Sequence, residues 1–130
     1  FSSSFSIENA IPWYGRRGLA YLLYEYEEHL FDGKQPIINW QVIAEGRDRS
    51  IEHILPQHPE ESGCWADRFT QEARQKFTHQ VGNLTLVLPE VNSALGRRTF
   101  LEKKGRLGQQ AACYANSDLK ITRELAEGLR

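Results

Sequence analysis

The chain has no methionine and only two cysteines among its 130 residues. With so few thiols and no Cys-x-x-Cys pair, it lacks the signature of a disulfide framework or of a zinc ribbon. A zinc site built from His58, Cys64, His79 and Cys113 would have spacings that match no standard ligand pattern. We therefore expect two reduced cysteines and no structural zinc.

Long apolar runs and an excess of charge of one sign are also missing. No apolar stretch approaches the roughly 20 residues that span a bilayer, and the first residues do not resemble a signal peptide. We therefore expect a cytoplasmic protein without a membrane partner. The net charge of −1 argues against nonspecific coating of nucleic acid. Any affinity for DNA must then reside in a local basic patch.

What is present is the composition of a globular domain. The hydrophobic fraction of 40% and the charged fraction of 25% are ordinary values, which argue against disordered and fibrous classes. A chain of this length buries about two thirds of its unfolded surface, enough for one core. We therefore expect residues 1–130 to form a single domain, and because the sequence opens at Phe1 without an initiator methionine, we expect this domain to be part of a longer protein.

Hydrophobic periodicity and turn residues predict an α+β fold. The predicted helices span residues 16–30, 65–80 and 90–104, with two shorter helical stretches in 108–130 that are separated around Asn116 and Ser117, where Ser117 could cap the last stretch. The predicted strands span residues 37–43, 51–55 and 83–88. Pro56 lacks a backbone donor, so the second strand should end close to His53.

The most informative segment is Ser50-Ile-Glu-His-Ile-Leu-Pro-Gln57, which contains His53. It is followed by Gly82-Asn-Leu-Thr-Leu-Val87 and then by Asn92. A histidine with an ordinary pKa of about 6.5 is well matched to take a proton from water at neutral pH. Glu52 and the side-chain carbonyl of Asn92 are oxygen ligands of the kind that hard divalent cations prefer. The pattern suggests a hydrolytic metal site.

Each of these residues also has a structural alternative. A single histidine in a half-buried strand is more often a hydrogen-bonded structural residue, Asn83 can be a turn residue, and Asn92 can cap a helix. Glu52 and His53 point to opposite faces of an ideal strand, so a shared site requires a twist, a strand end or a metal reached from the side. His79 precedes Gly82-Asn83 and could approach the site, but we expect an exposed or packing role for it, as for His29 and His58.

These motifs, together with Phe100-Leu-Glu-Lys103, resemble the HNH-like domain at the C-terminus of GmrSD-type, modification-dependent (type IV) restriction endonucleases. That domain belongs to the His-Me finger, or ββα-metal, nucleases. The segments Tyr21-Leu-Leu-Tyr-Glu-Tyr-Glu27 and Leu119-Lys-Ile-Thr-Arg-Glu-Leu125 are also similar to the family. The resemblance implies a ββα-metal core of a small antiparallel sheet and one helix, surrounded by additional helices.

The resemblance also implies a function, that of a metal-dependent DNA endonuclease serving as the effector domain of a restriction or phage-defence protein. His53 would activate the water, and Asn83 would hold the loop or the imidazole in place. Glu52 and Asn92 would bind one Mg²⁺ or Mn²⁺ ion. DNA is the implied partner, and the full-length protein would carry an N-terminal sensor or NTPase-like domain.

A basic segment follows Asn92. We expect Arg97, Arg98, Lys103 and Lys104 to contact DNA phosphates, since such contacts carry little sequence information. Lys103 lies too far along a helix from Asn92 to share its metal. The alternative for this segment is a solvated helix face. For the whole chain, the alternative function is a catalytically silent DNA-binding or protein-interaction module that retains the fold.

Overall fold

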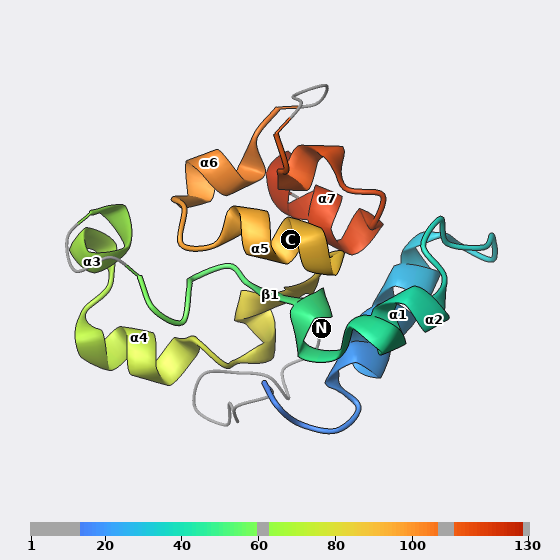
Figure 1. The fold of residues 1–130 in the computed structure, drawn as a ribbon, viewed down its shortest axis with the longest axis horizontal. Coiled ribbons are helices and arrows are strands. Elements are labelled where there is room, and N and C mark those ends of the chain that lie inside the picture. The colour runs from blue at the N-terminus through green and yellow to red at the C-terminus, as the bar shows by residue number, and fades with distance from the viewer. Residues whose placement is uncertain (1–13, 60–62, 107–110, 129–130) are drawn as a thin grey trace.

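The computed structural model describes residues 14–59, 63–106 and 111–128. They form an α+β fold in which helices surround a small antiparallel sheet of two strands (Figure 1). In chain order the elements are α1 (Leu19–Leu30), α2 (Trp40–Gly46), η3 (Arg47–Ser50), β1 (Ile51–His53), α3 (Cys64–Arg68), α4 (Gln71–Phe77), η4 (Val81–Asn83), β2 (Leu84–Leu86), α5 (Pro89–Leu95), α6 (Phe100–Lys104), η5 (Tyr114–Asn116) and α7 (Lys120–Glu127). Within the described ranges, none of the helices has the length and apolar character needed to cross a membrane.

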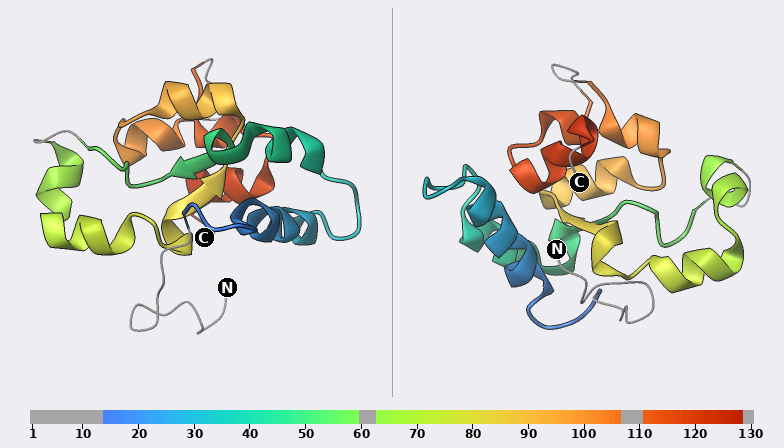
Figure 2. Two further views of the ribbon diagram at one scale, coloured as in Figure 1. Left: turned by 60° about the horizontal axis from the view of Figure 1, so that its bottom comes forward. Right: turned by 180° about the vertical axis from the view of Figure 1, so that it is seen from behind.

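The two strands define the centre of the molecule. In the antiparallel register Ile51 lies opposite Leu86, and His53 lies opposite Leu84. Helix α5 follows β2, so the order strand, strand, helix of a ββα-type fold is present, with α3 and α4 inserted between the strands. Helices α1 and α2 lie at one end of the molecule and α3 and α4 at the other, with the sheet between them (Figures 1 and 2).

Apolar side chains from both ends of the chain pack around the sheet. The main cluster contains Leu19, Leu23, Tyr24, Ile43, Ile51, Val81, Leu84, Leu86, Leu119 and Ile121. A smaller cluster contains Val87, Leu95 and Tyr114, with Val91 and Phe100 packed against it. Burial of these side chains removes apolar surface from water, which is the main force that holds β1 and β2 in place.

Glu27 joins the first helix to the last. Its buried carboxylate accepts hydrogen bonds from the backbone nitrogens of Lys120 at 2.8 Å and Ile121 at 2.7 Å. These amides open α7 and have no partner inside the helix, so the carboxylate satisfies them from the neighbouring helix. The contact fixes α7 against α1.

The strand predicted at residues 37–43 is wrong. Helix α2 begins there instead, because the side chain of Asn39 caps it by accepting a hydrogen bond from the Val42 backbone nitrogen at 3.2 Å. Ile43 is buried in the main cluster, while Val42 remains exposed. Local β propensity is outweighed by the cap and by packing against α1.

Two predicted helices are each divided into shorter ones. Within 65–80, Thr70 caps α4 and separates it from α3. Within 90–104, α5 ends at Gly96, whose φ of 47° favours glycine. Thr99 then begins α6 with a capping box. Periodicity alone did not show these breaks because helical spacing of apolar residues continues across both turns in the sequence, although α4 has no buried residue and Leu101 of α6 is exposed.

The other predicted elements are confirmed in shorter form. The strands predicted at 51–55 and 83–88 are β1 and β2, and the helix predicted at 16–30 is α1. In the predicted helical region 108–130, only α7 and the short η5 form, and residues 107–110 and 129–130 lie outside the described ranges. Ser117 is not the cap of α7, since its hydroxyl accepts a hydrogen bond from Leu119, which precedes the helix.

Candidate catalytic site around His53

His53 is the last residue of β1, and its side chain is 6% exposed. Strand pairing continues for one more backbone contact, from the Ile54 nitrogen to the Asn83 oxygen at 2.9 Å. The chain then leaves the sheet at Pro56, which has no N–H to donate. The candidate base therefore sits at the strand end, where the loop that follows can bring further side chains to it.

Both ring nitrogens of His53 have a neighbouring side chain. Nε2 lies 3.1 Å from Nδ1 of His79, and Nδ1 lies 3.4 Å from the amide nitrogen of Gln57. The ring of Tyr14 packs edge-on against His53, with centroids 4.3 Å apart, and stacks on His79 at 5.2 Å. The imidazole is therefore held in one orientation.

Burial also sets the protonation state of His53. Burial, together with unfavourable charge interactions with His79 and Lys103, lowers the pKa of His53 to about 4. The imidazole is consequently neutral near pH 7. A neutral imidazole has a lone pair that can accept a proton, which a general base requires.

Asn83 holds the loop that follows β1. Its side-chain oxygen accepts a hydrogen bond from the Leu55 nitrogen at 2.7 Å. Its side-chain nitrogen donates to the carbonyl oxygens of Leu55 at 3.0 Å and Thr78 at 2.9 Å. These bonds fix the segment after His53 relative to the segment that carries His79. The structure thus gives Asn83 loop-holding contacts, and its role in catalysis stays a prediction.

Glu52 faces away from His53. Its carboxylate, 2% exposed, accepts a hydrogen bond from the Tyr114 hydroxyl and forms an ion pair with Lys103 Nζ at 3.1 Å. Adjacent residues of a strand point to opposite faces, and the contacts of Glu52 and His53 lie with different neighbours. A metal shared by the two residues would have to be reached from the side, and the role of Glu52 as a ligand stays a prediction.

The prediction that Lys103 contacts a DNA phosphate is wrong for this structure. Its side chain is completely buried, and its ammonium donates to the backbone oxygens of His53 at 2.9 Å and Ile54 at 3.1 Å, besides pairing with Glu52. Burial raises the pKa of Glu52 and lowers that of Lys103, while the attraction between the two groups opposes both shifts. Lys103 is a support for β1.

Asn92 joins α5 to the segment before the sheet. Its side-chain nitrogen donates to the backbone oxygens of Arg49 and Ile51, both at 2.8 Å. Its expected role as a metal ligand through the side-chain oxygen stays a prediction. The bonds it makes in the structure hold the helix of the ββα unit against β1.

The described side chains do not supply the metal ligands expected from the sequence. Within the described ranges, no group of three or more His, Cys, Asp and Glu side chains is placed to hold a metal ion. Glu52 is engaged by Lys103, and the side-chain neighbours of His53 are His79, Gln57 and Tyr14. Mg²⁺ prefers several oxygen ligands, so the neighbours of His53 alone do not form a complete site for it.

Three of the predicted DNA contacts lie nearer the surface than Lys103. Arg97 and Arg98 are exposed in the turn between α5 and α6. Lys104 is half-buried, with its ammonium 5.4 Å from the centre of the Phe100 ring. Their contact with phosphates stays a prediction.

Sequence reasoning left His79 out of the site and missed Gln57 as a neighbour of His53. The signal for His79 was the strand pairing. An antiparallel register that places His53 opposite Leu84 also brings the residues before Leu84 beside the end of β1. Gln57 lies four residues after His53 in the loop, and its approach to the imidazole depends on a loop conformation that hydrophobic periodicity does not predict.

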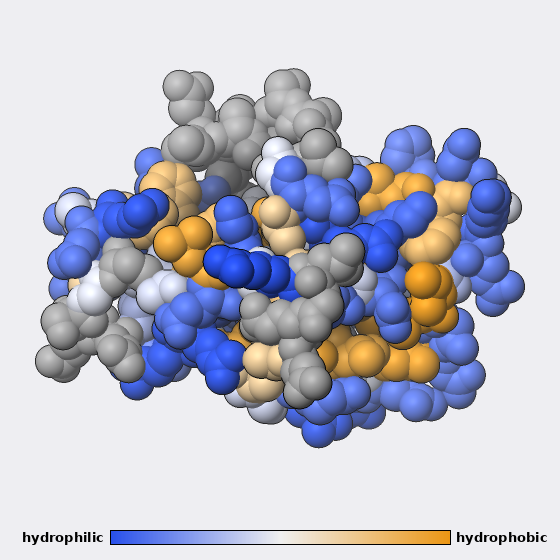
Figure 3. Space-filling view, turned by 90° about the horizontal axis from the view of Figure 1, so that it is seen from above, coloured by the Kyte–Doolittle hydropathy of each residue, from blue (hydrophilic) through white to orange (hydrophobic). Residues whose placement is uncertain are grey.

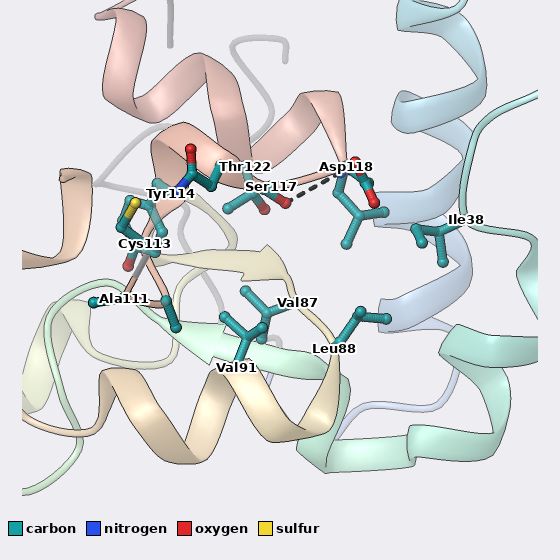
Figure 4. A pocket seen from close by; sticks show the side chains of 13 residues that line it. Ile38, Val87, Leu88, Val91, Ala111, Cys113, Tyr114, Ser117, Asp118 and Thr122 are labelled. Carbon is teal, nitrogen blue, oxygen red and sulfur yellow. Dashed lines mark hydrogen bonds between the residues drawn. The ribbon is translucent and has the colours of Figure 1, made fainter. Parts of the chain in front are cut away.

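A hollow lies on the Glu52 side of the sheet. It is an apolar cavity of about 170 Å³ with Val87, Leu88, Val91 and Tyr114 among its lining residues (Figure 4). None of the side chains that contact the His53 ring lines it, so it has no direct connection with the candidate base. Seen from above, the surface is largely hydrophilic with separate apolar patches (Figure 3).

The fold and the site together describe a ββα-type domain with a neutral histidine at the end of its first strand. Residues 2–128 match the model of the family described as GmrSD restriction endonucleases, C-terminal domain. Because the match covers nearly the whole chain, the protein belongs to this family. No curated protein and no solved structure matches it. Family membership supports a nuclease effector role in restriction.

Proposed function

We propose that this domain is a DNA endonuclease of the HNH, or His-Me finger, type and that His53 is its general base. The observation that carries the proposal is the neutral imidazole held at the end of β1 in a chain of the GmrSD restriction endonuclease family. A base that is unprotonated at neutral pH can deprotonate an attacking water. The N-terminal sensor or NTPase-like domain of the full-length protein would then select the DNA.

The contacts of His53 indicate which nitrogen acts. In one tautomer Nε2 carries the proton and donates to Nδ1 of His79, which lies at the shorter distance of 3.1 Å. The lone pair is then on Nδ1, where the exposed Gln57 amide approaches to 3.4 Å as a donor. A water that displaces this amide loses its proton to Nδ1 while its oxygen attacks phosphorus. The bond from phosphorus to the leaving sugar oxygen breaks.

We also propose that cleavage requires one divalent ion, Mg²⁺ or Mn²⁺. Such an ion, when bound, offsets the negative charge that builds on the phosphate. Of the two ligands expected from the sequence, Glu52 is paired with Lys103 and Asn92 is bonded to backbone oxygens before and within β1, and the role of each as a ligand stays a prediction. The requirement for an ion is therefore tested separately from the role of His53.

A catalytically silent DNA-binding or interaction module is the second candidate. The observation in its favour is that protein groups contact both ring nitrogens of His53. A base shielded on both sides is inactive unless substrate displaces one neighbour. The silent module would bind DNA with the same fold and leave it uncut.

Nicking of supercoiled plasmid distinguishes the two candidates. The chain is incubated with Mg²⁺ or Mn²⁺, with EDTA, and as the His53→Ala variant, beside His29→Ala as a matched change at an exposed histidine. Loss of a positioned general base should slow nicking by about 10²- to 10⁴-fold, whereas His29→Ala should nick like the wild type. Nicking that survives His53→Ala with the fold intact would falsify the assignment, and nicking that continues in EDTA would refute the ion requirement. Binding to plasmid without any nicking favours the silent module.

A further inference from the structure

A polar hollow of about 490 Å³ opens beside the His53 side chain. The loop after β1 contributes Gln57, His58 and Pro59 to its wall, and α4 with the residues that follow it contributes Arg74, Thr78 and His79 among others. We call it the α4 hollow. It is distinct from the turn that carries Arg97 and Arg98, neither of which lines it.

The α4 hollow is separated from the candidate base by single side chains. Gln57 and His79 both line the hollow, and they are the two residues that contact the ring nitrogens of His53. Gln57 is exposed, and its contact with Nδ1 of His53 is the longer of the two. A ligand in the hollow that moves the Gln57 amide therefore lies next to the lone pair on Nδ1.

The lining of the α4 hollow suits an anion. It includes one guanidinium, two imidazoles and several amides, and among the residues that the structure describes no carboxylate lines it. The guanidinium of Arg74 is half-buried and donates through Nη1 to the Phe69 backbone oxygen at 3.0 Å. This bond uses one of the five N–H donors of an arginine and holds the group in place. A fixed guanidinium is well suited to a phosphate, which it can bind through two parallel hydrogen bonds.

We infer that the α4 hollow is a phosphate subsite for the substrate backbone, with Arg74 as its principal contact. The inference rests on the proposed nuclease function, because it is the reacting strand that must pass beside His53. DNA then approaches across α4, and the turn with Arg97 and Arg98 contributes contacts away from the reacting phosphate. Gln57 and His79 form the boundary between the bound phosphate and the imidazole.

DNA binding without cleavage tests the subsite. The probe is a fluorescein-labelled 20-base-pair duplex, followed by fluorescence anisotropy in EDTA with the His53→Ala protein, so that the DNA stays intact. The logarithm of the binding constant falls linearly with the logarithm of the salt concentration, and loss of one phosphate contact reduces the steepness of that line by about 0.9. At about 0.1 M salt this corresponds to roughly eightfold weaker binding. We expect this change for Arg74→Gln. Lys34→Gln, a matched loss of one exposed positive charge in the loop after α1, should leave binding within about twofold.

Two further variants keep the inference open to refutation. Because Arg74 also holds the Phe69 carbonyl, Arg74→Lys is measured beside Arg74→Gln, and it should recover part of the affinity, since it retains the charge but not the two parallel hydrogen bonds. Binding by Arg74→Gln that equals Lys34→Gln, with a loss only in the double variant of Arg97 and Arg98, would overturn the subsite. A complete absence of salt-dependent binding would overturn it as well. Since no cleavage is measured, a failure of the subsite is distinguishable from a failure of the nuclease proposal.

Discussion

The two faces of β1 place neighbouring ionisable residues in opposite environments. On one face, Glu52 is enclosed with a positively charged partner, Lys103, and a hydroxyl donor, Tyr114. On the other, His53 is surrounded by Tyr14 and His79, with the α4 hollow beyond. Both side chains are buried, but among the described residues the neighbours of His53 line a polar hollow, whereas the cavity on the Glu52 side is apolar and smaller.

The difference shows how the same degree of burial can serve stability or chemistry. The interactions with Lys103 and Tyr114 counteract the effect of burial on the pKa of Glu52. The neighbours of His53 act in the same direction as burial and lower its pKa further. A group whose pKa is shifted without a compensating partner, beside a hollow, is a candidate for function. A compensated group is part of the structure.

Of the predicted changes, Lys103→Met should have the largest effect, because it disrupts the Glu52 face of β1. It leaves Glu52 as an uncompensated buried charge and removes the donor to the His53 and Ile54 carbonyls. Breaking a buried ion pair on one side costs about 3–5 kcal/mol. We therefore expect the free energy of unfolding, measured by urea denaturation, to fall by about that amount.

Two variants control this measurement. Lys104→Met removes a neighbouring charge that is only half-buried and should change stability by about 0.5 kcal/mol or less. Adding Glu52→Gln to Lys103→Met removes the stranded charge and should recover part of the loss. Equal stability of Lys103→Met and Lys104→Met would show that the enclosed face is not held by the ion pair.

Sequence reasoning found those parts of the fold that depend on local pattern. Strand β1, which ends at His53, strand β2 and the helix after β2 were predicted because alternation and Pro56 are local signals. The ion pair of Glu52 with Lys103 was not predicted, because the packing of α6 against β1 brings together two residues that are far apart in the sequence. A lysine on a short basic helix has the same local pattern whether it is solvated or buried. His53 was found from its motif, whereas His79 required the strand register.

His79→Phe should have a smaller effect, confined to the open face. Phenylalanine retains an aromatic ring against Tyr14 but removes the acceptor for the Nε2 proton of His53. Loss of a group that orients a reactive imidazole reduces activity by about 10- to 100-fold. Because His79 also lowers the pKa of His53, the acidic limb of the rate profile should move to higher pH. Plasmid nicking over a pH series measures both changes.

The controls for His79 distinguish positioning from packing. His79→Gln keeps a hydrogen-bond acceptor and should recover part of the rate, whereas His29→Phe, at an exposed site, should leave the profile unchanged. A rate lost equally in His79→Phe and His79→Gln, with no displacement of the acidic limb, would argue that the residue contributes packing alone.

The pH dependence of the wild type should show the smallest change. Neutral His53 is the active form, and its pKa of about 4 keeps it neutral through most of the accessible range. Nicking should therefore change by less than about twofold between about pH 8 and 5.5, whereas a histidine of pKa about 6.5 would lose roughly tenfold over the same range. A rate that halves near pH 6.5 would contradict the assignment of the base or the burial of its imidazole.

The lowered pKa of His53 also predicts how the free energy of unfolding depends on pH. The direction is opposite to that for a histidine paired with a carboxylate, whose pKa is raised. The folded protein binds fewer protons at His53 than the unfolded chain does between about pH 4 and 6.5, so stability should fall as pH falls through that window. His53→Gln should remove this part of the pH dependence. NMR titration of the His53 ring protons locates the pKa directly. A value near 6.5 in the folded protein would remove the electrostatic distinction between the two faces of β1.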